Sequence, residues 1–161
     1  MISLTHKIAT GLIGLLISTL QPVFADCFDI HGRNFGVAPD LLRAIALTES
    51  SGNPSALAGP KCSQDIGLMQ INSQWLSKWK LSKSELLNNA CLNIEVGARI
   101  LKDNLMRFDN PWEAVGAYNA GCSKLKGQDC TDARQKYAWK VFKNLQSLDD
   151  KTREKLKAVA S

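Results

Sequence analysis

An apolar stripe in the first third of the chain ends in a carboxylate. In the segment PDLLRAIALTES, which begins at Pro39, the residues Leu41, Leu42 and Ile45 recur at helical spacing and mark the inward face of a predicted helix. Glu49 lies four residues after Ile45, so it continues this face instead of pointing to water. An inward carboxylate costs free energy unless it is paired. Glu49 is therefore the first candidate functional residue.

The predicted helix stops directly after Glu49. Residues 50–54, Ser-Ser-Gly-Asn-Pro, form a turn signal that leaves the carboxyl group at the edge of a loop. One interpretation is a helix-end residue satisfied by local hydrogen bonds. The other is a general acid, because partial desolvation favours the protonated form of a carboxyl group near neutral pH.

Further amphipathic segments predict a mainly helical, all-α protein. A first helix over residues 27–35 should end at Gly36. A short helix should begin at Ser82, which has capping-box spacing to Glu85. An irregular helical return is expected after Gln70, and no segment shows sustained two-residue alternation. The remaining predicted helices cover residues 91–108, 110–120 and 131–148.

Two positions within these segments are unusual. Gly97 interrupts the longest amphipathic pattern at a cost in helix propensity, and we expect it to permit a close helix crossing. The charged tail at residues 149–161, DDKTREKLKAVAS, is poorly patterned for packing. We expect this tail to be frayed or flexible, and a helix that docks on a partner is the alternative.

Residues 1–25 have the three-part plan of a secretory signal peptide. His6 and Lys7 precede an uncharged apolar stretch, and the small or apolar residues at positions 23–25 suit cleavage after Ala25. A retained membrane anchor is the alternative, but the apolar run is short for a span of about 20 residues. We therefore expect export to the periplasm or beyond, no permanent anchor, and one domain over residues 26–148.

The charge balance is mildly basic. The formal net charge is +5, and residues 1–25 contribute one lysine and no acid to it. This excess suits a mildly anionic partner such as a cell-wall polymer, and it is also compatible with an ordinary solvated surface. No cluster of lysine and arginine alternates with aromatic residues, so we expect no nucleic-acid partner.

All five cysteines follow residue 25, which is typical of proteins from an oxidising compartment. Cys122 and Cys130 enclose a short polar loop and are candidates for a local disulfide. The odd number leaves at least one thiol over, and spacing alone does not fix the other connections. No Cys-x-x-Cys sequence or neighbouring histidine supports a metal site, so we expect neither a metal nor another cofactor.

Three short motifs follow one another along the chain. They are Glu49-Ser50-x-x-Asn53-Pro54, Gly67-Leu68-Met69-Gln70 and Ala117-Tyr118-Asn119-Ala120-Gly121. The ordered set resembles the lytic transglycosylase domain of lysozyme-like fold, especially the small exported forms that accompany secretion and conjugation machines. The resemblance covers residues 26–147 and implies action on peptidoglycan glycan strands, with components of an envelope-spanning machine as further partners. We expect the protein to be a monomer.

The resemblance also implies roles for the motif residues. Glu49 is expected to be the catalytic acid and base, and Tyr118 is expected to orient Glu49 through its hydroxyl group. For each motif residue a structural role is the alternative, such as a helix-end serine, a core aromatic ring or a core methionine. The expected substrate-binding residues of the motifs are Ser50, Met69, Gln70 and Asn119.

The loop between the first two motifs departs from the family pattern. Larger relatives have a Ser-x-x-Gly element there, whereas residues 55–65 of this chain read SALAGPKCSQD. Ser63 is the candidate for the sugar-binding role of that element. In the family, a disulfide at positions similar to Cys27 and Cys91 commonly ties the first helix to the domain. Cys62 is then the expected free thiol.

The chemistry that the resemblance implies needs only one carboxyl group. The glutamate protonates the bridging oxygen and then takes a proton from the C6 hydroxyl of the sugar, which leaves a 1,6-anhydromuramoyl end. A muramidase-type hydrolase that uses Glu49 with Asp65 or a held water is one alternative. A glycan-binding or assembly subunit without turnover is an alternative from another class.

Overall fold

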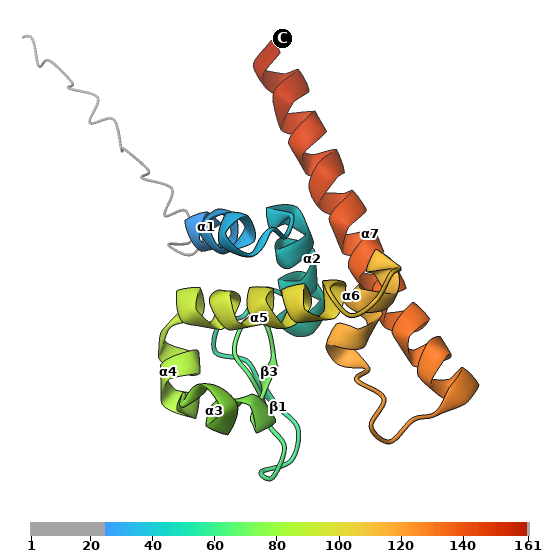
Figure 1. Ribbon diagram of the computed structural model, residues 1–161. Coiled ribbons are helices and arrows are strands. Elements are labelled where there is room, and N and C mark those ends of the chain that lie inside the picture. The colour runs from blue at the N-terminus through green and yellow to red at the C-terminus, as the bar shows by residue number, and fades with distance from the viewer. Residues whose placement is uncertain (1–24, 161) are drawn as a thin grey trace, which may run out of the picture.

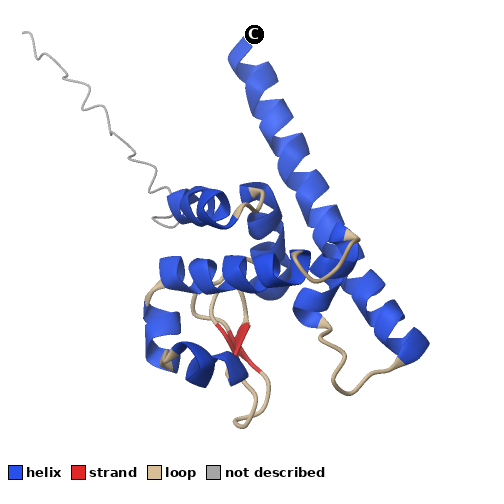
Figure 2. Ribbon diagram, viewed as in Figure 1, coloured by secondary structure: helices blue, strands red, loops and turns tan. Residues whose placement is uncertain are grey.

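Helices make up most of residues 25–160, which the computed structural model describes (Figures 1 and 2). Residues 1–24, which hold most of the predicted signal peptide, and residue 161 lie outside this description. The mainly helical fold class is therefore confirmed. The helices are α1 (Ala25–Phe35), α2 (Pro39–Ser50), α3 (Gln74–Trp79), α4 (Lys83–Asn88), α5 (Ala90–Leu105), α6 (Pro111–Asn119) and α7 (Gly127–Ala160).

Helix α5 forms the centre of the core. It contacts α1, α2, α4, α6 and the small sheet, and Figure 1 shows it crossing the molecule between α1 and the sheet. Ile94 and Leu101 on its inward face have no exposed surface, and neither do Leu42 and Ile45 of α2. The stripe that predicted α2 is thus buried on the core, which brings the end of α2 close to the loops below α5.

Local capping signals place several helix ends as predicted. The Ser82 hydroxyl accepts a hydrogen bond from the Glu85 N–H at 3.2 Å, and the Glu85 carboxylate accepts one from the Ser82 N–H at 2.7 Å. This capping box starts α4. Asn110 accepts from the Trp112 N–H at 2.9 Å and starts α6. Gly36 follows α1 in the left-handed region, at a φ of 67°.

A small antiparallel sheet replaces part of the helical return expected after Gln70. β1 (Leu57–Ala58), β2 (Asp65–Ile66) and β3 (Ile71–Asn72) pair in that order. In the register of β2 and β3, Asp65 lies opposite Asn72 and Ile66 opposite Ile71. The helix that we expected directly after Gln70 begins only at Gln74. Strands of two residues are too short for their alternation to be recognised in a sequence.

Helix α7 corrects the prediction for the carboxyl-terminal region. We expected this helix to end at residue 148 and the tail to be frayed, but it is continuous from Gly127 to Ala160 and projects beyond α2 (Figure 1). No glycine or proline interrupts it after Gly127, and Asp149 pairs with Arg153 one turn later at 2.8 Å. Good helix formers thus extend the helix without an apolar stripe. Neither α7 nor another helix within residues 25–160 has an apolar segment long enough to cross a membrane.

Two disulfides form as expected. Cys27 joins Cys91 and so ties α1 to the start of α5, and Cys122 joins Cys130 across the loop before α7. Cys62 is exposed and is the free cysteine of the described residues. The connectivity implied by the family resemblance is therefore confirmed.

Candidate active site

Glu49 lies in the last full turn of α2, at the wall of a cavity of about 340 Å³. Ser51 ends the helix in the left-handed region, at a φ of 54°, and its N–H returns to carbonyl groups of the preceding turn. The sheet, α3, the last turns of α5 and α6 and the first part of α7 all contribute residues to the wall of this cavity. The side chains at its wall include Glu49, Asp65, Gln70, Asn72, Trp75, Lys78, Asp103, Arg107, Tyr118 and Asn119.

The Glu49 carboxyl group titrates near neutral pH. Burial raises its pKa from 4.5 to about 7. The hydrogen bond from Tyr137 lowers this pKa, the negative charge of Asp65 raises it, and the positive charge of Lys140 lowers it, in decreasing order of effect. At pH 7 the protonated and ionised forms are therefore both populated, as a group that acts first as an acid and then as a base requires.

Tyr137 of α7 is the direct hydrogen-bond partner of Glu49. Its hydroxyl group donates to Oε1 of Glu49 at 2.6 Å, across 88 positions of sequence. A second bond between the same two helices, from the Asn144 side chain to the Thr48 hydroxyl at 2.9 Å, fixes their crossing. Burial raises the pKa of Tyr137 well above its usual value, so its hydroxyl group remains a donor. The sequence marked Tyr137 only as part of an apolar helix face.

Tyr118 does not make the contact that was predicted for it. Its hydroxyl group donates to the carbonyl oxygen of Met69 at 3.0 Å instead of to Glu49. The side chain still lines the cavity, and burial together with the charge of Glu49 raises its pKa. The Tyr118 hydroxyl group also lies close to α5, where a Cβ added at Gly97 would lie 2.9 Å from the Tyr118 oxygen.

Ser50 and Gln70 bind the backbone that shapes the cavity. The Ser50 hydroxyl donates to the Leu68 carbonyl oxygen at 2.7 Å and so ties α2 to the second motif. Nε2 of Gln70 donates to the carbonyl oxygen of Gly67 at 2.8 Å, and Gln70 itself is in the left-handed region at a φ of 47°. Gln70 lines the cavity, as does the exposed Asn119 at the end of α6.

Met69 and Ser63 do not line the cavity themselves, but each is hydrogen-bonded to a residue that does, Met69 to Tyr118 and Ser63 to Asn72. The Met69 side chain is fully buried and fills the space left by Gly97, where an added Cβ would lie 2.8 Å from its terminal carbon. Ser63 is exposed in the loop before β2, where its hydroxyl accepts a hydrogen bond from the Asn72 amide at 3.1 Å. The Ser63 N–H donates to the Pro60 carbonyl oxygen at 2.9 Å in a turn of the same loop.

Asn93 of α5 holds the second motif in place through hydrogen bonds to its backbone. This fully buried side chain accepts from the Met69 N–H at 2.7 Å and donates to the Ile66 carbonyl oxygen at 2.9 Å. Gly67, at a φ of 75°, has no room for a Cβ because the Asn93 amide lies directly against it. Asn93 therefore explains why a glycine is needed in this motif. The amphipathic pattern of α5 gave no sign of this role, because asparagine reads as a polar interruption.

The sequence of the chain matches a known family over most of its length. The model of the transglycosylase SLT domain matches residues 26–141. The chain belongs to this family.

Relatives and a solved structure agree with the assignment. Invasion protein IagB of Salmonella typhi is 37% identical over 147 residues, which cover 89% of this chain and 89% of IagB. Protein IpgF of Shigella flexneri is 38% identical over 123 residues, which cover 74% of this chain and 78% of IpgF. An inactive mutant of the lytic transglycosylase Slt from Pseudomonas aeruginosa superposes with a TM-score of 0.60 at 21% identity, over 79% of this chain and 24% of the Slt chain.

This SLT-family member is a peptidoglycan lytic transglycosylase with a lysozyme-like fold, as the motifs predicted. In the enzyme, Asp65 also lines the cavity and accepts a hydrogen bond from the Asn72 amide at 2.8 Å. Its negative charge raises the pKa of Glu49, so the two carboxyl groups interact. Within residues 25–160, no three side chains of the metal-binding types come together as a metal site.

The transglycosylase has a part of its cavity wall that the motifs did not reveal. Trp75 and Lys78 of α3 line it, and Trp75 stacks on Trp79 with ring centroids 4.8 Å apart. The Lys78 ammonium lies 4.7 Å from the centre of the Trp75 ring. Asp103 and Arg107, near the end of α5, line another part of the wall. Spacing within α3 could have suggested a pair of stacked rings, but not the cavity they face.

Proposed function

We propose that this enzyme cleaves the MurNAc–GlcNAc β-1,4 bond of peptidoglycan and leaves a 1,6-anhydromuramoyl end, with Glu49 as the sole acid and base. The observation that carries the proposal is the single carboxyl group at the cavity wall whose pKa lies near 7. Both steps of the reaction need the same group, first protonated and then ionised.

In the first step, Glu49 gives its proton to the bridging oxygen as the C1–O bond breaks. Tyr137 donates to Oε1, so Oε2 is the oxygen that delivers the proton. The electron pair of the broken bond goes to the leaving oxygen, and an oxocarbenium-like centre remains at C1 of the muramoyl ring. The Tyr137 hydrogen bond stabilises the carboxylate that this step produces.

In the second step, the ionised Glu49 takes a proton from the C6 hydroxyl group of the same sugar. The C6 oxygen bonds to C1, and Glu49 returns to its protonated form. No water is consumed, and the nucleophile is held near C1 by the sugar ring itself. In this proposal, Tyr118, Gln70 and Asn119 shape the sugar-facing wall and Ser50 holds the end of α2.

A hydrolytic reaction is the second candidate, and Asp65 is the observation that favours it. Asp65 lines the same cavity and its charge acts on Glu49. A second carboxylate could activate a water or stabilise the positive C1 centre, as in two-carboxylate glycosidases. The ends of the products decide: anhydro ends support the transfer and reducing ends support hydrolysis.

Mass spectrometry of muropeptides released from purified peptidoglycan tests the proposal. The enzyme without residues 1–25 should release anhydromuramoyl products, and Glu49→Gln should lower the rate by roughly a hundred-fold or more. Glu95→Gln is the matched control, because Glu95 is exposed on α5. Normal release by Glu49→Gln would remove Glu49 from the mechanism. Release of muropeptides would also distinguish an enzyme from a glycan-binding subunit without turnover.

We further propose that the enzyme is exported to the periplasm and opens the wall locally for an envelope-spanning secretion or conjugation machine. The secretory signal plan of residues 1–25 and the two disulfides support export. The similarity to a protein named invasion protein IagB supports the link to such a machine. Amino-terminal sequencing of the protein from a periplasmic fraction should give Asp26 as the first residue, and a retained Met1 would contradict export by cleavage.

A further inference from the structure

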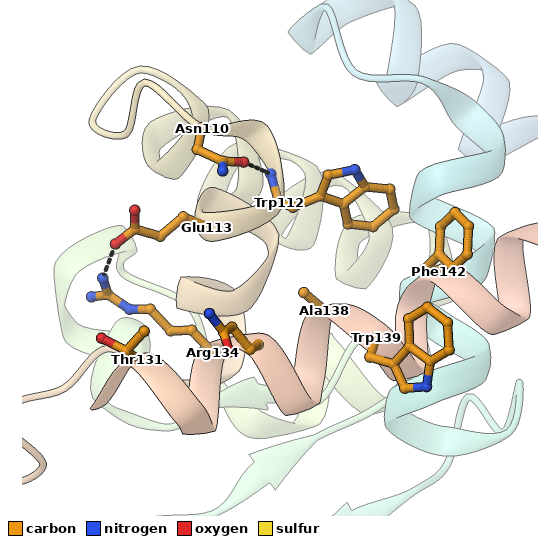
Figure 3. Close-up of a pocket in the computed structure, with 9 residues that line it drawn as sticks. Asn110, Trp112, Glu113, Thr131, Arg134, Ala138, Trp139 and Phe142 are labelled. Carbon is orange, nitrogen blue, oxygen red and sulfur yellow. Dashed lines mark hydrogen bonds and ion pairs between the residues drawn. The ribbon is translucent and has the colours of Figure 1, made fainter. Parts of the chain in front are cut away.

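A second cavity of about 470 Å³ lies between α6 and α7, and three aromatic rings line it (Figure 3). Trp112 meets Phe142 edge to face with ring centroids 5.5 Å apart, and Trp139 stacks on Phe142 at 5.4 Å. Trp139 is 58% exposed and Trp112 is 39% exposed, so the rings are open to a ligand. Exposed aromatic surface gathered in a hollow is typical of binding sites.

The rim of this aromatic cavity is polar, and the positive charge of Arg134 there is balanced by Glu113. Arg134 pairs with Glu113 at 2.7 Å, and its guanidinium lies 4.6 Å from the centre of the Phe108 ring. The side-chain amide of Gln135 lines the cavity and has no hydrogen-bond partner among the described residues. Such a rim suits a neutral ligand that carries hydroxyl or acetamido groups.

The aromatic cavity and the catalytic cavity share a wall. Arg134 lines both of them, and its Nε donates to the Ala120 carbonyl oxygen at 3.2 Å, where α6 ends. Phe108 lines the catalytic side and Asn110, two residues later, lines the aromatic side. The two cavities are therefore neighbours on either side of Arg134.

We propose that the aromatic cavity is a secondary binding site for N-acetylhexosamine rings of the glycan strand, remote from the bond that is cut. A pyranose ring has an apolar C–H face that can stack on the open face of Trp139, while its hydroxyl and acetamido groups reach Gln135 and Asn110 at the rim. A strand cut internally has sugars on both sides of Glu49, so a bound strand extends past the catalytic cavity. The inference rests on the proposed function, since it assumes a glycan substrate.

Calorimetric titration with N-acetylglucosamine oligomers tests this site. The background is Glu49→Gln, and the variants that are added to it are Trp139→Ala, Trp139→Phe and, as a control, Met106→Ala. Met106 is 78% exposed and lines neither cavity. Trp139→Ala should weaken binding of the hexamer roughly 3- to 10-fold and leave binding of the dimer unchanged. Trp139→Phe should retain most of the affinity, and Met106→Ala should retain all of it.

Two results would overturn the secondary site. Equal hexamer affinity with and without Trp139 would show that the rings do not bind the strand, and the cavity would then be left to a protein partner. An equal loss for dimer and hexamer would place the effect in the catalytic cavity. The proposed reaction is judged separately from the products of the wild-type enzyme, because the titrations use a background that does not turn over.

Discussion

Glu49 owes its titration near neutral pH to burial more than to any single charged neighbour. Burial is the largest influence on its pKa, and the opposing effects of Tyr137 and Lys140 are smaller. A carboxyl group whose pKa is raised in the folded state favours folding less and less as the pH rises from its unfolded pKa to its folded pKa. The catalytic residue is thus also a source of instability at alkaline pH.

Glu49→Gln should therefore stabilise the protein in a pH-dependent way. Below about pH 4.5, Glu49 is protonated in both the folded and the unfolded state, so the variant and the wild type should unfold alike. Above pH 7 the folded wild type holds a desolvated charge, and the variant should be more stable by up to about 3 kcal/mol. Urea unfolding at pH 4 and pH 8 measures this difference. A variant that is less stable at pH 8 would refute a raised pKa at Glu49.

Tyr137→Phe should change the pH profile of the reaction, whereas Tyr118→Phe should not. Tyr137 donates to Glu49 and lowers its pKa, so its loss should move the decline of activity at high pH further upward. The rate should fall roughly ten-fold or more, because a hydrogen bond to a charged group is lost. Tyr118→Phe removes only the bond to the Met69 carbonyl oxygen. A shifted profile in Tyr118→Phe alone would restore the role predicted from the motif.

At the residue scale, the sequence predicted the acid but not its partner. Glu49 was found because its position on an inward face conflicts with its charge, and that conflict is visible in a linear pattern. Tyr137 was missed because it follows the same spacing as Val141 and so reads as a core residue. Its role depends on how α7 crosses α2, which no local signal determines.

At the scale of secondary-structure elements, the site depends on one close contact between α5 and the second motif. Gly97→Ala adds a Cβ that would lie 2.8 Å from the end of Met69 and 2.9 Å from the Tyr118 oxygen. The gain in helix propensity, about 1 kcal/mol, opposes an overpacking cost of about 1–3 kcal/mol. The Met69 end can move, but the Tyr118 hydroxyl group is held by a hydrogen bond. We therefore expect a net loss of about 1 kcal/mol, measured by thermal or urea unfolding.

Gly121→Ala is the matched control for that variant. An added Cβ at Gly121 meets nothing within 4 Å, and Gly121 is not among the residues with a positive φ. Its stability should equal that of the wild type. If Gly97→Ala is as stable as Gly121→Ala, the close crossing of α5 does not constrain the site.

Helix starts were predictable from the sequence, but the ends of helices and the sheet were less so. Ser82 and Asn110 begin helices through their own side chains, so the signal is local. The sheet forms only when short segments pair across a loop, and α7 continues through good helix formers that carry no apolar stripe. The expected helix end at residue 148 was wrong, because residues 149–160 continue the helix without an apolar stripe.

At the scale of the whole molecule, one disulfide ties the first helix to the central helix of the core. Cys27 and Cys91 are 64 residues apart, and the bond connects α1 to α5. In the chain-entropy model a loop of this length corresponds to about 4 kcal/mol. Cys27→Ser with Cys91→Ser should lower the free energy of unfolding by that order, measured with urea. Cys62→Ser, at an exposed free cysteine, should have no effect, and an equal loss there would contradict the assignment.

The catalytic cavity is a property of the whole molecule and could be predicted only in part. The three motifs supplied Glu49, Gln70 and Tyr118, which lie on its wall. Trp75 comes from α3 and Arg107 from the turn after α5, two segments that carry no motif and that join the wall only in the folded chain. Local patterns therefore identified the reacting group and its immediate neighbours, but not the surfaces that meet the rest of the substrate.

The side chains that hydrogen-bond to the backbone of the loop at residues 66–70 are uncharged. A serine hydroxyl, a tyrosine hydroxyl and the amides of Asn93 and Gln70 hold it. None of these groups gains or loses a proton between mildly acidic and mildly alkaline conditions. Acidification across the Glu49 titration should thus switch the enzyme's chemistry while its architecture stays rigid, so kinetic measurements over that range report the catalyst and not a collapsing scaffold.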